Sequence, residues 1–170
     1  MQSSSLLTPN ALAFIGLCNE YCKATLQAAE SECSDFTASM LRLLPRLYIA
    51  ATDLPSATDP DGYIEPVMDE DLYDSSRRSI ESLMGADDTY LEVFEEDMKY
   101  SDTPIAASVS EGLCDILQVC YNFIETIRDA PEPVVIQALD VIKSDFESYW
   151  SRILCNVLRA LNQIRYSSVN

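Results

Sequence analysis

The sequence predicts an all-α protein, a bundle of four long amphipathic helices and one short helix with a long acidic connection. Apolar residues recur at intervals of three and four over most of the chain, and Ser, Thr or Asp precedes several of these stretches in the manner of an N-cap. Because each helix must bury its apolar stripe against the others, we expect residues 1–170 to form one domain.

The first two helices lie before the acidic connection. The first is expected over residues 9–30, since Thr8 is a typical N-cap and Pro9 a typical first helical residue. The second is expected over residues 34–51, with a kink at Pro45, which lacks a backbone N–H group.

The connection contains a short third helix. Residues 53–68 are rich in proline and are expected to form a loop, whereas Asp69 as a cap and Gly85 as a stop predict a helix over 70–84. The stretch 89–94 fits either a short extended segment or one more helical turn, because Tyr, Val and Phe favour a strand but six residues do not decide.

Two long helices complete the bundle. Thr103 and Pro104 repeat the cap-and-proline signature, so the fourth helix is expected to start there and to end near Ile127. The fifth helix is expected to be the longest, with one wide apolar stripe from Leu139 to Ile164.

The composition excludes several classes of function. The chain has no histidine and a formal net charge of −17. Ser-His-Asp triads, Cys-His dyads and histidine-bound metals are therefore excluded. The charge should repel nucleic-acid phosphates and anionic lipid, so we expect neither nucleic acid nor a membrane as a partner. The sequence indicates no cofactor.

The cysteines and the N-terminus point to the cytoplasm. We expect the cysteines to be buried and reduced, because they lie in apolar helical patterns: Cys18, Cys22, Cys33, Cys114, Cys120 and Cys155. The four-residue spacing of Cys18 and Cys22 also permits a pair of metal ligands. The longest apolar run near the N-terminus, Ala11–Cys18, has 8 residues, against the ~20 of a membrane span, and no basic start of a secretory signal precedes it.

The negative charge is concentrated in residues 53–102, which hold 16 acidic and three basic residues and carry a net charge of −13. Tyrosines are interleaved with these acids. We therefore expect a non-enzymatic interaction or regulatory module that binds a basic protein or peptide through this segment. The residues expected on that surface are Tyr73, Tyr90, Glu92, Glu95, Glu96 and Asp97, with Arg152 and Arg159 from a basic stripe of the last helix.

Two other interpretations of these residues stay open. The tyrosines would fix the connection to the bundle, and the polar stripes would be ordinary solvated helix faces. Alternatively, the acidic segment would fold over the stripe that carries Arg152 and Arg159 and bury part of it.

An enzymatic alternative is a Mg²⁺-dependent nucleotide phosphohydrolase. Its metal ligands would be Glu92 and Glu95, three residues apart, with Glu111 and Asp115, four residues apart. These spacings direct carboxylates at one hard cation when the residues are helical. A chain with 28 acidic residues also contains such spacings by chance, so the interaction module is the favoured interpretation.

Three groups of residues resemble DUF5063, a bacterial family of small all-helical proteins of unknown function. They are the run Gly85–Tyr90, the pair Asp115-Ile116, and Trp150 followed by the run Leu158–Leu161. The resemblance covers about Leu12 to Ile164. It implies the helical fold and no established activity. In the family pattern the tryptophan is often flanked by histidine and glycine, whereas Tyr149 and Ser151 flank it here, so no imidazole chemistry is implied.

Overall fold

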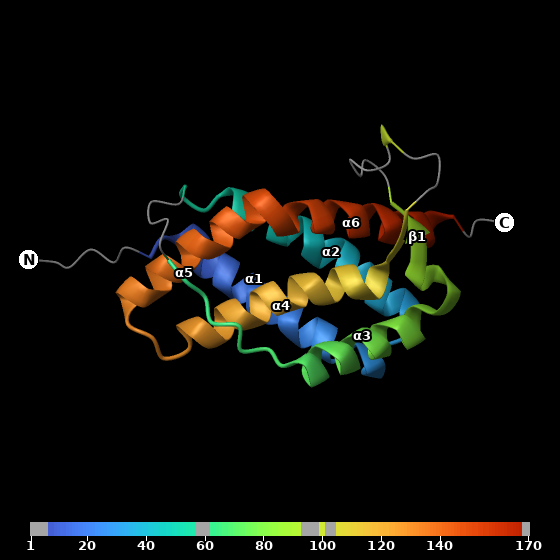
Figure 1. Cartoon of the computed structure of the whole chain (residues 1–170), viewed down its shortest axis with the longest axis horizontal. Coiled ribbons are helices and arrows are strands. Elements are labelled where there is room, and N and C mark those ends of the chain that lie inside the picture. Colours follow the sequence, from blue (N-terminus) through green and yellow to red (C-terminus); the bar gives the residue numbers. More distant parts are fainter. Residues whose placement is uncertain (1–6, 57–61, 93–98, 101–104, 168–170) are drawn as a thin grey trace, which may run out of the picture.

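The computed structural model describes residues 7–56, 62–92, 99–100 and 105–167. It confirms the predicted helical bundle and adds a small two-stranded hairpin at one end (Figure 1). The helices are α1 (Pro9–Leu26), α2 (Cys33–Thr52), α3 (Glu70–Met84), α4 (Val109–Ile127), α5 (Glu132–Asp145) and α6 (Ser151–Tyr166). The 3-10 turns η1 (Ala28–Glu30) and η2 (Gly85–Asp88) follow α1 and α3.

Helix α4 lies at the centre of the arrangement and packs against α1, α3, α5 and α6, while α2 packs against α1 and α6. The extended connection before α3 crosses the outside of the bundle (Figure 1). There the Met68 N–H donates to Oδ1 of Asn122 on α4 at 2.8 Å. This bond attaches the end of the connection, just before α3, to the central helix.

The predicted helix signals at Thr8, Asp69 and Gly85 are confirmed. Thr8 Oγ1 accepts the Ala11 N–H at 3.1 Å, and Asp69 Oδ1 accepts the Leu72 N–H at 2.7 Å. Gly85 ends α3 with a φ of 60°, a left-handed conformation that only glycine adopts without strain.

The hairpin resolves the ambiguous stretch and corrects the start of the fourth helix. Strands β1 (Thr89–Leu91) and β2 (Ala106–Ser108) pair antiparallel, with Tyr90 opposite Ala107. The predicted helix start near Thr103 and Pro104 is wrong, because β2 precedes α4 and Ser108 is its N-cap. Thr103 and Pro104 themselves lie outside the described residues.

The fifth predicted helix is helical from Glu132 to Tyr166 but is not one α-helix. A π-helical turn, η4 (Phe146–Trp150), separates α5 from α6. The fully buried Trp150 in this turn donates from Nε1 to the Ile142 carbonyl at 3.2 Å and packs on the Phe146 ring at 4.6 Å. The turn therefore anchors the last helix in the core.

All six cysteines are free thiols. Cys18, Cys22, Cys114 and Cys120 are buried as expected, whereas Cys155 on α6 is exposed. No helix among the described residues has the length and apolar character needed to cross a membrane.

Candidate functional site

The hairpin carries two of the predicted site residues, Tyr90 and Glu92, toward the bundle. Glu92 directly follows β1, and its N–H donates to the Ile105 carbonyl at 2.7 Å, which extends the ladder by one bond. Glu92 is therefore extended and not helical, and the helical spacing assumed for Glu92 and Glu95 does not hold at Glu92.

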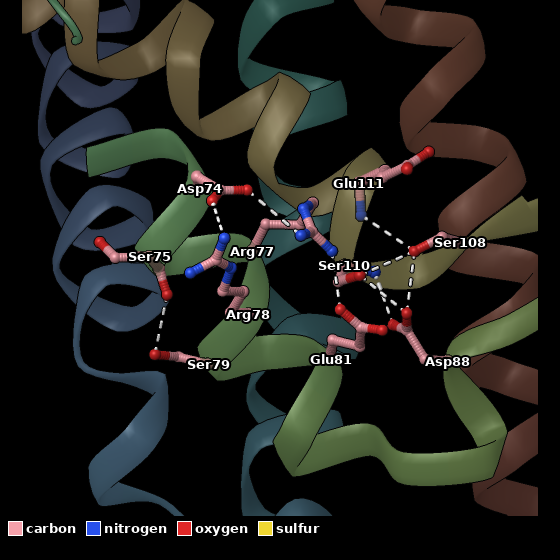
Figure 2. A network of polar contacts seen from close by, with 10 residues as sticks. All are labelled: Asp74, Ser75, Arg77, Arg78, Ser79, Glu81, Asp88, Ser108, Ser110 and Glu111. Carbon is pink, nitrogen blue, oxygen red and sulfur yellow. Dashed lines mark hydrogen bonds and ion pairs between the residues drawn. The ribbon is translucent and has the colours of Figure 1, made fainter. Parts of the chain in front are cut away.

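Asp88 attaches the hairpin to the N-terminus of α4. Its buried carboxylate accepts the Ser110 N–H at 2.8 Å, the Ser110 hydroxyl at 2.7 Å and the Ser108 hydroxyl at 2.9 Å (Figure 2). A carboxylate is favoured there because the N-terminus of a helix carries partial positive charge. Asp88 thereby fixes where Tyr90 and Glu92 lie.

A hollow of about 270 Å³, which we call the mixed pocket, lies between the hairpin, α4 and the η4–α6 segment. Its charged and hydrogen-bonding side chains come from five elements, namely β1 with the residue after it, β2, α4, η4 and α6: Tyr90, Glu92, Ser108, Glu111, Asp115, Tyr149, Arg152 and Asn156. Glu92 Oε2 accepts from Asn156 Nδ2 at 2.7 Å, and Glu92 Oε1 accepts the Tyr90 hydroxyl at 3.2 Å. The acidic segment therefore contacts α6 through a polar bond next to Arg152.

A second hollow, of about 460 Å³, lies between α3, α4 and the connection before α3. This acidic groove is lined by Met68, Glu70, Asp71, Tyr73, Asp74, Asp115 and Gln118. Four of these seven side chains are carboxylates, and Met68 and Tyr73 supply apolar surface.

Asp115 lines both hollows, so the acidic groove and the mixed pocket meet at this side chain. Tyr73 donates its hydroxyl to Asp115 Oδ1 at 2.7 Å. Burial raises the pKa of Asp115, the hydrogen bond from Tyr73 opposes that rise, and the nearby charge of Glu111 adds to it. Burial and the bond to Asp115 likewise raise the pKa of Tyr73.

Ion pairs neutralise one end of the acidic groove. Asp74 binds Arg77 at 3.2 Å and Arg78 at 2.7 Å, and Arg77 also binds Glu81 at 2.7 Å (Figure 2). Among the described residues no basic side chain forms an ion pair with Glu70, Asp71 or Glu111. The carboxylates without an ion pair are therefore at the first turn of α3, in the acidic groove, and at Glu111 of α4, in the mixed pocket.

The structure brings together part of the predicted site. Tyr90, Glu92, Glu111, Asp115 and Arg152 line the mixed pocket, and Tyr73 lines the acidic groove. Arg159 lines a neighbouring hollow on α6, which shares Tyr90 and Asn156 with the mixed pocket. The predictions for Glu95, Glu96 and Asp97 fall outside the described residues.

The metal interpretation gains no geometric support. Among the described residues, no group of three or more Cys, Asp or Glu side chains is placed to hold a metal ion. Glu92, Glu111 and Asp115 share a pocket, but two of these carboxylates already accept hydrogen bonds from protein side chains.

Sequence reasoning missed the acidic groove. Asp69, Glu70 and Asp71 are explained in the sequence by the preference of helix N-termini for acids, and nothing local shows that α4 lies opposite them. Tyr149 was also missed. Burial raises the pKa of Tyr149, the charge of Asp115 raises it further, and Arg152 opposes both effects.

Comparison with known proteins identifies a family and a fold. A family model described as a domain of unknown function, DUF5063, matches residues 5–167. The chain is similar to a crystal structure of protein BF1032 from Bacteroides fragilis, with 26% sequence identity, a TM-score of 0.84 and 98% of each chain covered. No curated protein matches the chain.

Proposed function

The chain belongs to DUF5063, a family described as a domain of unknown function, and we propose that this member is a protein-interaction module. The acidic face, which we define as the acidic groove together with the mixed pocket, would bind a basic segment of another protein. The observation that carries this proposal is the meeting of the two hollows at the half-buried carboxylate of Asp115.

The distribution of charge supports a cationic partner. Glu70, Asp71 and Glu111 have no ion-pair partner among the described side chains, and the whole chain carries −17. A field of one sign attracts a ligand of the opposite sign and raises its rate of association. A Lys- or Arg-rich segment fits that field.

The lining of the acidic groove supports a peptide better than a simple ion. Met68 and Tyr73 provide apolar area beside the carboxylates, and the long stems of Lys and Arg pack on such surface while their charged ends reach the acids. Tyrosine contributes contact area at a low cost in conformational entropy.

We further propose a cytoplasmic location in a bacterium. The six free thiols fit a reducing compartment, and the similar protein BF1032 comes from Bacteroides fragilis.

The test uses fluorescence polarisation with labelled hexalysine as the probe and labelled hexaglutamate as the anionic control. We expect hexalysine to bind at about 20 mM salt and to dissociate at about 300 mM, because the Debye length shortens severalfold. Hexaglutamate should not bind.

Matched variants separate a specific site from the general field. The double variant E70Q/D71N removes two charges from the acidic groove, whereas E30Q/E32Q removes two exposed charges before α2. We expect the first to weaken hexalysine binding by about five- to tenfold and the second to leave it nearly unchanged. Equal weakening by both, or no binding at low salt, contradicts the proposal.

A further inference from the structure

A third hollow lies next to the mixed pocket, with which it shares Tyr90 and Asn156. It has a volume of about 490 Å³ and lies between β1 and α6, where its lining includes Tyr90, Leu91, Cys155, Arg159, Ala160 and Gln163. Sites for small ligands have volumes of about 300–1,000 Å³ and mostly apolar walls with a few polar groups. This hollow meets both criteria.

The hollow continues along α6. A neighbouring depression, also of about 490 Å³, is lined by Leu41, Pro45, Leu158 and Tyr166, and it shares Cys155 and Arg159 with the first. We call the two together the α6 groove. It is an elongated surface with Arg159 in its middle.

The α6 groove leaves apolar side chains in water. Leu91 is 60% exposed and Tyr166 is 67% exposed, and both line the groove. Exposed apolar side chains gathered along one groove mark a surface that a ligand or a partner can cover.

The charge of the groove has the sign opposite to that of the protein. Helix α6 contains three arginines and no acidic residue, in a chain of net charge −17. Among the described residues Arg159 forms no ion pair. The nearest part of the hairpin offers Glu92, but its carboxylate faces the mixed pocket and is held there by Asn156 and Tyr90.

We propose that the α6 groove binds a free long-chain carboxylic acid, with the carboxylate on the Arg159 guanidinium and the alkyl chain along the apolar wall. A guanidinium binds a carboxylate through two parallel hydrogen bonds, which orients the head group. Leu91 and Ala160 on one side, or Leu158 and Tyr166 on the other, would cover the chain. This proposal does not rest on the proposed function, although the α6 groove and the mixed pocket share Tyr90 and Asn156.

Cys155 provides a direct reporter of occupancy. It is the exposed cysteine of the chain and lines both parts of the groove, whereas four of the others are buried and Cys33 is half-buried. Dodecanoate bound in the groove should slow modification of Cys155 by the neutral reagent N-ethylmaleimide, measured on the Cys155 peptide by mass spectrometry. Isothermal titration calorimetry gives the affinity independently.

The ligand series tests the two parts of the proposed ligand. Dodecanoate, kept below its micelle concentration, should protect Cys155 saturably. Acetate, which lacks the chain, and dodecyltrimethylammonium, which has the same chain and the opposite charge, should not protect it. Equal protection by the ammonium compound, or none by dodecanoate, would overturn the proposal.

The variant R159Q should weaken dodecanoate binding about tenfold or more, because the head group loses its charged partner. R165Q is the matched control, since it removes the same charge from the exposed last turn of α6, outside the groove lining. Arg159 is exposed, so R159Q should keep the wild-type circular dichroism spectrum. A folded R159Q protein with unchanged affinity, or equal weakening by R165Q, would refute the assignment.

Discussion

At the scale of single residues, Gly112 allows α4 and α6 to pack closely. A Cβ atom at this position would overlap with Cγ2 of Val157 on α6 and would contact Ile153 Cγ2 at 3.6 Å. Val157 is fully buried, so it has little room to move. Gly16 on α1 is the opposite case, because it is exposed and no atom lies within 4 Å of a Cβ added there.

We expect Gly112→Ala to lower the free energy of unfolding by about 1–3 kcal/mol, the usual cost of overpacking a core. Gly16→Ala should raise it by about 0.5–1 kcal/mol, because alanine has the better helix propensity. Urea denaturation followed by circular dichroism measures both. If Gly112→Ala is as stable as the wild type, α4 and α6 are not in close contact at this point.

The sequence alone does not separate these two glycines. Both lie inside predicted helices, and their local patterns carry no information about which one faces another helix. By contrast, the Thr8 cap was predictable, because it depends on a side chain and an N–H only three residues apart.

At the scale of elements, Asp88 determines whether the hairpin stays attached to the bundle. Its carboxylate accepts three hydrogen bonds from Ser108 and Ser110 (Figure 2). A three-residue strand pair is too short to be stable by itself. The hydrogen bonds to Asp88 therefore stabilise the hairpin, because the short β1–β2 ladder is too weak to do so alone.

We expect Asp88→Asn to cost about 1.5–3 kcal/mol of stability, because hydrogen bonds to a charged group are replaced and one acceptor oxygen is lost. Hydrogen exchange should accelerate at the amides of 89–91 and 106–110 more than in α1. Asp87→Asn is the matched control, since Asp87 is the exposed neighbour in η2. Equal acceleration in both variants would show that the carboxylate of Asp88 is not the anchor.

The elements differ in how far they could be predicted. Both ends of α3 were predictable because the signals at Asp69 and Gly85 are local. The start of α4 was not predictable, because Thr103-Pro104 and Ser108 offer equivalent cap signals. The start at Ser108 is favoured by the hydrogen bond from its hydroxyl to Asp88, which lies twenty residues earlier in the chain. The π-helical turn at Trp150 also escaped prediction, since an apolar stripe is compatible with a continuous helix.

At the scale of the whole molecule, the charge pattern was predictable and its geometry was not. The acidic segment and the basic stripe are visible in the composition of 53–102 and of the last helix. Whether Glu92 and Arg152 share a pocket depends on the hairpin, which long-range contacts create. Arg159, expected beside Arg152 on one surface, lines a neighbouring hollow that shares Tyr90 and Asn156 with the pocket of Arg152.

The pH dependence of stability tests the electrostatics of the whole molecule. Burial raises the pKa of Asp115 and of Asp145 above the ordinary value of 3.8. Between that value and the folded pKa, the native state binds more protons than the unfolded state, so stability falls as the pH rises through the folded pKa. The self-repulsion of a chain with charge −17 acts in the same direction.

We therefore expect the urea midpoint to rise as the pH is lowered from about 7 to about 4.5, with an unchanged m-value. Asp115→Asn should flatten this rise, because asparagine does not titrate and its side-chain oxygen still accepts the Tyr73 hydroxyl. Glu30→Gln, which removes one exposed charge, should leave the slope nearly as it is in the wild type. Two results would contradict this prediction: a urea midpoint that falls on acidification over this range, or a slope that Asp115→Asn does not change. Either would mean that the Asp115 carboxylate is not desolvated in the folded protein.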